Sequence, residues 1–301
     1  MYRDDRDRLV GETELVASVD MQKVIMLPRI PGLKVVVFCK RIVIFNETFA
    51  PLGKGKKATG VLWHEGIKGR SAPDLASIFT TFIRANRDIE DFIFWVDNCS
   101  GQNKNWYPFT ALSNEVNIGT SNVKTITLKY FEPGHTFMSA DSFHHKVEQG
   151  MRQMKRVEDF QDFVEIVEKC GKALVMKYSD FYDVPKGLLQ AVYASEKPRL
   201  ENVQVIKFVR GSAKMFWKCN YSDAEFKSAR FLQKKFEKNI GKNKFSQCNE
   251  NRGVKTCKKE NIIKALCPHM KERSKQFWNN LYVNELSADL VTKRDPSEAS
   301  E

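Results

Sequence analysis

Short runs of apolar and polar residues cover the first 66 residues and predict β-strands. Three segments are rich in β-branched and aromatic residues: ELVASVD at 14–20, VVVFCKRIVIFNETF at 35–49 and ATGVLWHEG at 58–66. These residue types favour strands, and the connections between the three segments are short. The first part of the chain therefore predicts three consecutive strands.

The next apolar pattern has the spacing of a helix. Ser71 and Pro73 mark a helix start, and five apolar residues follow at i, i+3, i+4, i+7 and i+8, namely Leu75, Ile78, Phe79, Phe82 and Ile83. This stripe predicts a helix over 73–86. A strand at 92–96, a helix that runs to 118 and a strand at 125–131 follow, so the predicted order is β, β, β, α, β, α, β.

The second half of the chain has weaker periodicity. It predicts helices at 140–155 and 156–170, a hairpin at 203–221 and a basic helix over SDAEFKSARFLQKKF. A polar loop at 239–257 and terminal helices within 259–281 complete the prediction.

This order predicts an α/β protein with a ribonuclease H-like fold, a mixed five-stranded sheet flanked by helices. The catalytic core is expected at 12–185, and a basic α+β extension at 186–285 is expected to form a C-terminal subdomain. Residues 1–11 and 286–301 are expected to be flexible tails.

The predicted strand FIFWV ends on Asp97, and the first strand ends on Asp20. A charge at the end of a buried strand is costly unless a partner or a metal offsets it. In a ribonuclease H-like sheet the first and fourth strands are neighbours, so the two carboxylates would meet. Asp141 and Glu148 are seven residues apart on one helix face, and each is a candidate for the third carboxylate.

Such carboxylates predict a centre that holds two Mg²⁺ or Mn²⁺ ions about 4 Å apart and that cleaves phosphodiesters. Four residues are candidates for accessory roles, such as contacting phosphate or orienting water: Asn98, His135, His144 and His145.

Simpler interpretations exist for the same residues. Asp97 and Asp141 could each be a helix N-cap, and Glu148 could be an exposed helical residue. Zinc is not expected, because Cys248, Cys257 and Cys267 lack the close pairing of structural zinc sites.

The net charge of +12 is concentrated in one part of the chain. Residues 186–275 hold 22 Lys and Arg against 8 Asp and Glu, whereas the remainder is nearly balanced. Concentrated positive charge favours a polyanion such as DNA, although a solvated basic surface would have the same composition. The candidate DNA contacts are Lys227, Arg230, Lys234, Lys235 and Lys238.

The location of the protein is expected to be intracellular and nuclear. The N-terminal residues contain no apolar stretch typical of a signal peptide, and no run of 18 apolar residues predicts a membrane span. Seven cysteines, an odd number spread along the chain, suit reduced thiols better than a disulfide framework.

Several linked motifs also carry a resemblance: SVDMQKVIMLP, FNETFAP, LWHEGIKGRSAPD, DNCSGQNKNW and GHTFMSADSFHHKVE. They resemble a transposon-associated domain of animal genomes with a D-N-C-x-x-Q-N-K-N hallmark. That domain is similar to DDE-type transposase and integrase cores, and the resemblance extends over about residues 14–285. It implies a ribonuclease H-like core with Asp20, Asp97, Asp141 and Glu148 at the matching positions.

The sequence thus predicts a transposase-derived protein that cleaves DNA and transfers strands with a divalent metal. A homo-oligomer on DNA is compatible with this prediction, and a membrane partner is not expected. Two alternatives remain. Proteins of this type usually carry a long N-terminal region, and its shortness here favours a catalytically inactive descendant that binds DNA or protein. A nuclease for RNA or hybrid duplexes is the other alternative, because fold and metal do not select the substrate.

Overall fold

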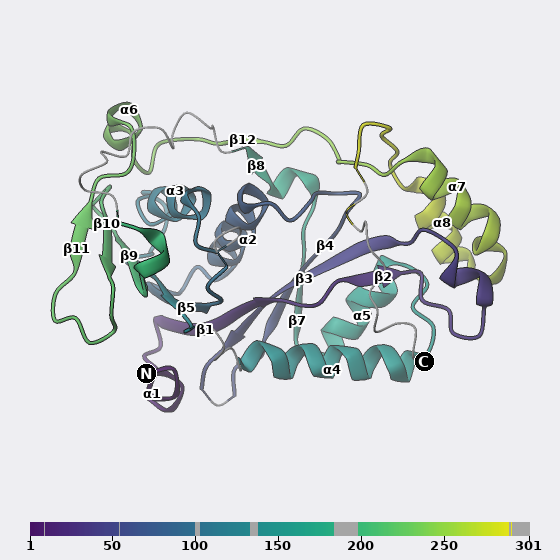
Figure 1. The fold of residues 1–301 in the computed structure, drawn as a ribbon, viewed down its shortest axis with the longest axis horizontal. Helices are drawn as coiled ribbons and strands as arrows, with labels where there is room; N and C mark the ends of the chain where they lie inside the picture. The colour runs from purple at the N-terminus through teal and green to yellow at the C-terminus, as the bar shows by residue number, and fades with distance from the viewer. Residues whose placement is uncertain are drawn as a thin grey trace.

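The computed structural model describes residues 1–8, 10–53, 55–99, 103–132, 138–183, 198–288 and 290. Within this part of the chain a large mixed sheet runs through the molecule, with helices on both of its faces (Figure 1). The strand order is β11-β10-β9-β6-β5-β1-β3-β4-β7, and β2 also pairs with β3. No described helix is long and apolar enough to cross a membrane.

The centre of the sheet consists of five strands in the predicted order along the chain: β1 (Glu14–Met21), β3 (Ile42–Pro51), β4 (Thr59–His64), β5 (Asp91–Val96) and β6 (Thr125–Tyr130). Strand β1 pairs in parallel with β5, which pairs in parallel with β6. Strand β3 is antiparallel to both of its neighbours, β1 and β4. The α/β class with a mixed sheet is therefore confirmed.

The described sheet is wider than the predicted five strands. Strand β7 (Lys172–Val175) extends it beside β4, and β2 (Ile25–Leu27) pairs with β3. At the other edge β9 (Val205–Val209) pairs with β6 and continues through β10 (Met215–Lys218) to β11 (Lys227–Ala229). Three strands of the predicted subdomain are thus part of the main sheet, because the edge of β6 supplies backbone partners to β9.

Two local predictions in these regions were wrong. The expected strand at 35–49 begins as a short 3-10 helix at Lys34–Val37, and only Ile42–Pro51 pairs as a strand. The expected basic helix at 222–236 instead contains strand β11 and the short helix α6 (Lys234–Lys238). Pairing of β11 with Met215–Trp217 outweighs the helical tendency of this segment.

The two faces of the sheet are covered by different helices. Helices α2 (Ala72–Ala85) and α3 (Trp106–Glu115) pack on one face, where Phe49 stacks on Phe82 with ring centroids 3.9 Å apart. Helices α4 (Ser139–Met154) and α5 (Phe160–Cys170) pack on the other face, in a second apolar cluster that includes Phe143. The predicted start of α5 at 156 was early, because Asp159 caps the helix.

The N-terminal residues, expected to be a flexible tail, form helix α1 (Tyr2–Asp7). The Tyr2 ring packs edge-on against Trp95 and Phe131, and the Asp5 carboxylate accepts hydrogen bonds from Trp95 Nε1 (2.9 Å) and Lys129 Nζ (2.5 Å). These contacts hold α1 against the sheet. Within the other predicted tail, Ser287 is buried, and residues 291–301 lie outside the described residues.

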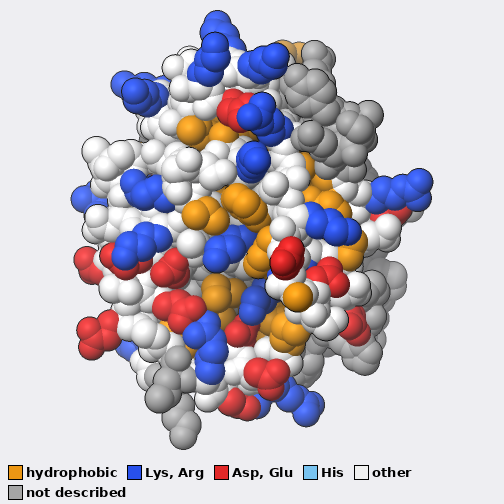
Figure 2. Space-filling view, turned by 90° about the vertical axis from the view of Figure 1, so that its left-hand side faces the viewer, with side chains coloured by type: hydrophobic (Ala, Val, Ile, Leu, Met, Phe, Trp, Pro, Cys, Tyr) orange, Lys and Arg blue, Asp and Glu red, His pale blue; other side chains and the backbone are white. Residues whose placement is uncertain are grey.

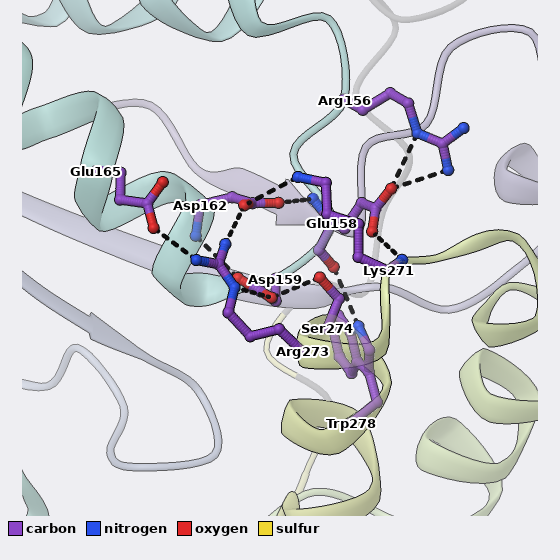
Figure 3. A network of polar contacts seen from close by, with 9 residues as sticks. All are labelled: Arg156, Glu158, Asp159, Asp162, Glu165, Lys271, Arg273, Ser274 and Trp278. Carbon is purple, nitrogen blue, oxygen red and sulfur yellow. Dashed lines mark hydrogen bonds and ion pairs between the residues drawn. The ribbon is translucent and has the colours of Figure 1, made fainter.

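The C-terminal helices α7 (Thr256–Ala265) and α8 (Glu272–Asn280) pack at the far end of the sheet from α1, where a group of ion pairs joins α8 to the start of α5 (Figures 1 and 3). We call this group the α5–α8 network: Arg156, Glu158, Asp159, Asp162, Glu165, Lys271, Arg273, Ser274 and Trp278. A two-stranded sheet of β8 (Tyr182–Asp183) and β12 (Ser246–Gln247) is separate from the main sheet.

Candidate functional site

Asp20 and Asp97 lie at the carboxyl ends of two adjacent strands in the middle of the sheet. Parallel strands β1 and β5 are in register from Glu14 opposite Asp91 to Val19 opposite Val96, so Asp20 and Asp97 are the next pair. The sequence-based prediction that the two residues lie at the ends of adjacent parallel strands is confirmed. Both side chains are partly exposed, so the strand ends carry them out of the apolar core to the surface.

Helix α4 brings two more ligand-type side chains to Asp20. Ligand atoms of Asp20, Asp141 and His144 all lie within 4.8 Å of one another, and His144 Nδ1 is 3.9 Å from Asp20 Oδ2. Backbone contacts position the helix on β1, since Ala140 N donates to Ser18 Oγ (3.0 Å) and Gln22 Nε2 to the His144 carbonyl (3.4 Å). Two carboxylates and an imidazole form a donor set that suits an ion such as Mn²⁺.

The electrostatics of this cluster follow from its burial. Desolvation, and then the charges of Asp97 and Asp141, raise the pKa of Asp20 to about 7. Burial lowers the pKa of His144 to about 4, against the opposing effects of Asp141 and the Asp20 backbone. His144 is therefore neutral at pH 7, which is the form of imidazole that binds metals.

Side-chain hydrogen bonds join the described residues at the two ends of the DNCSGQNKN segment. Asn103 Nδ2 donates to Asp97 Oδ1 (2.5 Å), and Lys104 Nζ donates to Asn98 Oδ1 (2.6 Å). The Asn105 side chain caps α3 by accepting from Tyr107 N (3.1 Å). The alternative in which Asp97 caps this helix is therefore wrong, whereas Asn98 has a defined partner.

Lys104 is buried beside this segment, and its ammonium lies 4.7 Å from the centre of the Tyr130 ring. Burial lowers the pKa of Lys104 to about 8, while Glu201 acts in the opposite direction. Asn98 and Lys104 line a cavity of about 490 Å³, together with Phe131, Glu132, Gln204 and Asn220. This cavity adjoins the Asp97 end of the site.

The simpler interpretations of Asp141 and Glu148, the two carboxylates of α4, have different outcomes. Asp141 does have a capping role, because its Oδ2 accepts a hydrogen bond from Met138 N (2.8 Å), yet it also belongs to the cluster around Asp20. Glu148 is partly exposed and lines a cavity of about 370 Å³ together with Asp20, Asp141 and His144. It lies outside the three-residue cluster, so Asp141 is the closer of the two predicted carboxylates.

Of the two remaining histidine candidates, His145 does not join the cluster. His145 is exposed, and its Nε2 lies 3.0 Å from Gln149 Nε2, although the ring lines the same cavity. His135 lies outside the described residues.

The structure adds Glu47, a carboxylate that sequence reasoning missed. Glu47 is 1% exposed on β3, and its Oε2 has no hydrogen-bond partner. Burial, followed by the charges of Asp20 and Asp97, raises its pKa well above the ordinary value. The only signal in the sequence was a glutamate inside the apolar run IVIFNETFAP, where the face that it occupies could not be read.

Unpartnered polar atoms gather around the paired aspartates. Five buried side-chain polar atoms have no hydrogen-bond partner in the described part of the chain, and three of them are Glu47 Oε2, Asn103 Oδ1 and His144 Nε2. Most buried polar atoms in folded proteins have a partner, so this concentration indicates a site that is completed by a ligand.

The five basic candidates for DNA binding are all exposed, and they lie on or near β11 and α6. Figure 2 shows this side of the molecule, with Lys and Arg prominent in the upper part and Asp and Glu in the lower half. Lys227 Nζ lies 5.1 Å from the centre of the Trp217 ring, and Arg230 pairs with Glu237 at 3.6 Å.

The cysteines considered for zinc lie in different settings. Cys248 is buried, Cys257 is exposed on α7, and Cys267 is buried in the turn that follows α7. Cys248 Sγ accepts a hydrogen bond from Lys68 Nζ (3.0 Å). Within the described ranges, Asp20, Asp141 and His144 form the one group with metal-ligand geometry.

Comparison with curated proteins and with solved structures finds no match. A family model, described as a domain of unknown function, DUF7869, matches residues 72–222. The match includes β5, the DNCSGQNKN segment and α4, and it spans half of the 301 residues. The chain therefore belongs to the DUF7869 family.

Proposed function

We propose that this chain is a transposase-derived protein with a ribonuclease H-like core, and that it cleaves DNA phosphodiesters and transfers strands with Mn²⁺ or Mg²⁺. The observation that carries the proposal is the meeting of Asp20 and Asp97 at one sheet edge, with Asp141 and His144 of α4 facing Asp20. The sheet order supports it, because β4-β3-β1-β5-β6 with β3 alone reversed is the arrangement expected of a ribonuclease H-like core.

The residues fit the metal that the proposal requires. Asp20, Asp97, Asp141 and His144 would hold it, and when bound it would activate the attacking oxygen and stabilise the leaving one. Asn103 holds the Asp97 carboxylate in place, and Ser18 and Gln22 hold α4 against β1. Neutral His144 keeps a lone pair available at the pH of a cell.

The exposed basic surface supports DNA as the substrate in this proposal. Lys227, Arg230 and the three lysines of α6 are exposed and are suited to phosphate contacts. A nuclear location and a homo-oligomer on DNA stay predictions that follow from this function.

The test of the chemistry is cleavage of a supercoiled plasmid in Mn²⁺, Mg²⁺ or Ca²⁺ by the parent and by Asp97→Asn. We expect nicking in Mn²⁺ and Mg²⁺ but not in Ca²⁺, and its loss in Asp97→Asn without a fall in melting temperature. DNA binding without any cleavage by the parent would favour the inactive descendant. Cleavage of RNA or hybrid duplexes alone would favour the other alternative.

The test of the substrate surface is the salt dependence of DNA binding. Replacing Lys234, Lys235 and Lys238 by Gln should lower the slope of log K against log salt by up to about 2.7, since each phosphate contact contributes about 0.9. Replacing the exposed Lys169, Lys172 and Lys177 of another surface is the matched control, and it should leave the slope unchanged. Equal slopes for both triple variants would contradict DNA binding by α6.

A further inference from the structure

A cavity of about 490 Å³ adjoins the Asp97 end of the candidate site and has no role in the chemistry proposed above. Asn98, which directly follows Asp97, is on its wall, and so is the buried Lys104. The volume falls within the range of about 300–1,000 Å³ that is typical of ligand-binding pockets. Its size and position suit a part of the substrate that lies next to the reacting phosphodiester.

Lys104 determines what the inner part of this cavity can bind. The residue is 3% exposed, and its Nζ donates to two neutral acceptors, Asn98 Oδ1 (2.6 Å) and the Glu201 carbonyl (3.4 Å). Burial lowers the pKa of Lys104 to about 8, so the amine is still mainly protonated at pH 7. A buried ammonium is costly, and a ligand with further acceptor atoms would stabilise it.

The other walls exclude some ligands that carry acceptors. Phe131 and Val203 are buried and give the cavity an apolar surface. Glu132 and Glu201 also line it, and both are exposed, which places their negative charges toward the mouth. A phosphate would be repelled there. A flat, uncharged ligand with acceptors at its inner edge and donors at its outer edge matches all of these walls.

The four DNA bases differ in this respect. When the sugar stays outside the cavity, guanine presents O6 and N7 inward and thymine presents O4, and all of these atoms are acceptors. Adenine and cytosine would present an amino group to Lys104, and two donors do not pair. At the outer edge guanine has the N2 amino donor, whereas thymine has the O2 acceptor. The carboxylates of Glu132 and Glu201 therefore select guanine over thymine.

We propose that this cavity binds one unstacked guanine base of the DNA substrate, with O6 toward Lys104 and the N2 amino group toward Glu132 and Glu201. Unstacking a base costs free energy, which contacts of this kind offset in proteins that bind extruded bases. This inference rests on the proposed function, since it takes DNA as the substrate. It adds a preference for one base beside the cleaved bond.

The test compares the affinity of the full chain for four short single-stranded thymine tracts, whose central base is guanine, adenine, cytosine or thymine. Fluorescence anisotropy in chelator measures binding without cleavage. We expect the guanine strand to bind about tenfold more tightly than the other three, as a good pair of contacts to one base would give. A fifth strand with hypoxanthine, which keeps O6 and N7 but lacks the N2 amino group, should lose part of this preference.

Variants assign the preference to the cavity. Lys104→Met keeps the length of the side chain but removes the donor, so it should abolish the preference for guanine. The double variant Glu132→Ala and Glu201→Ala should bind guanine and hypoxanthine strands equally, because the partner of the N2 amino group is gone. Glu225→Ala is the matched control, since Glu225 is exposed but does not line the cavity, and it should keep the full preference.

The outcomes separate this proposal from the proposed function. Equal affinity of the parent for all four strands, or a guanine preference that survives Lys104→Met, would overturn the guanine site while leaving metal-dependent cleavage intact. A parent that binds none of the strands would overturn the guanine site, and plasmid cleavage would then decide the proposed function by itself. If Lys104→Met does not fold, the double glutamate variant changes only exposed side chains, and an unchanged guanine preference in it would overturn the proposal.

Discussion

Two groups of buried or partly buried carboxylates lie in different parts of this fold, and they differ in the charges that surround them. In the α5–α8 network, Asp159 and Asp162 are almost fully buried, and Arg273 pairs with both (Figure 3). Further partners satisfy the same carboxylates: Ser274 Oγ donates to Asp159 (2.6 Å), and Lys271 lies 3.7 Å from Asp162.

The group around Asp20 lies at a cavity that Lys23 also lines. His144, which lies 3.9 Å from Asp20, is a neutral ring at pH 7, and burial together with neighbouring carboxylates raises the pKa of Asp20 and of Glu47. Carboxylates that stabilise a fold are paired, as the α5–α8 network shows. Carboxylates that are buried beside one another cost stability, which favours a functional reason for keeping them.

The largest effect is expected from breaking the paired group. Asp159→Ala removes the cap of α5, where Asp162 N donates to Asp159 Oδ1 (2.8 Å), and leaves the buried Ser274 without its acceptor. The free energy of unfolding should fall by about 2–4 kcal/mol. Denaturant unfolding measures this change, and Asp159→Asn, which keeps an acceptor oxygen, should lose less. An unchanged free energy of unfolding would mean that the ion-paired carboxylates of the α5–α8 network do not stabilise the fold.

At Asp20, by contrast, a substitution should raise the free energy of unfolding. Its pKa is about 7 in the folded protein and 3.8 in an unperturbed carboxyl, so the folded state binds the proton more tightly. The stability contributed by this proton is present below pH 4 and is lost as the pH rises to 7. Asp20→Asn without metal should therefore gain about 1–3 kcal/mol at pH 8, since one pKa unit corresponds to about 1.4 kcal/mol.

The measurement for Asp20 is urea unfolding in chelator from pH 4 to pH 8. The gain in Asp20→Asn should shrink as the pH falls and disappear near pH 4. A variant that is less stable than the parent at pH 8 would mean that Asp20 has an unrecognised cation partner.

A smaller effect separates the two adjacent histidines of α4. His144→Ala should weaken Mn²⁺ binding about tenfold, because it removes one ligand of the cluster. His145→Ala is the matched control, since this ring is exposed and lies outside the cluster, and it should bind Mn²⁺ like the parent. Titration of the metal-induced rise in melting temperature measures both, and equal losses would place the ion elsewhere on α4.

The smallest effect is expected at the exposed edge of the paired group. Glu165 contacts Arg273 at 2.7 Å, but its side chain is 35% exposed. Glu165→Gln should lower the free energy of unfolding by less than about 1 kcal/mol, because water and salt screen exposed pairs. A loss as large as that of Asp159→Ala would show that charge, rather than burial, controls the stability of this network.

Local patterns in the sequence were sufficient for the elements that build the centre of the sheet. The stripe from Leu75 to Ile83 predicted α2, which forms at Ala72–Ala85 with the Ser71 and Asp74 capping interactions. Strand-forming runs placed Asp20 and Asp97 at strand ends, because apolar runs and their polar stops are local signals. The positions of these two carboxylates needed no tertiary information.

Pairing between distant segments decided the rest. The valines at 35–37 satisfy β propensity but do not pair as a strand, and Val37 and Phe38 remain exposed. Residues 227–229 have a basic, helix-like composition yet pair with β10 at the edge of the sheet. Edge pairing depends on which backbone is available in space, and sequence patterns do not contain that information.

The candidate site also combines features that local sequence patterns predict with features that depend on tertiary contacts. The sequence by itself determined that carboxylates end β1 and follow β5, and that Asp141 lies on a helix. Only the tertiary structure decided that His144, rather than His145, faces Asp20 and that Glu47 is buried beside the two aspartates. The physical reason is that the register of β1 with β3 and the docking of α4 on β1 select which face of each element meets the site, and a shift of one residue would reverse both choices.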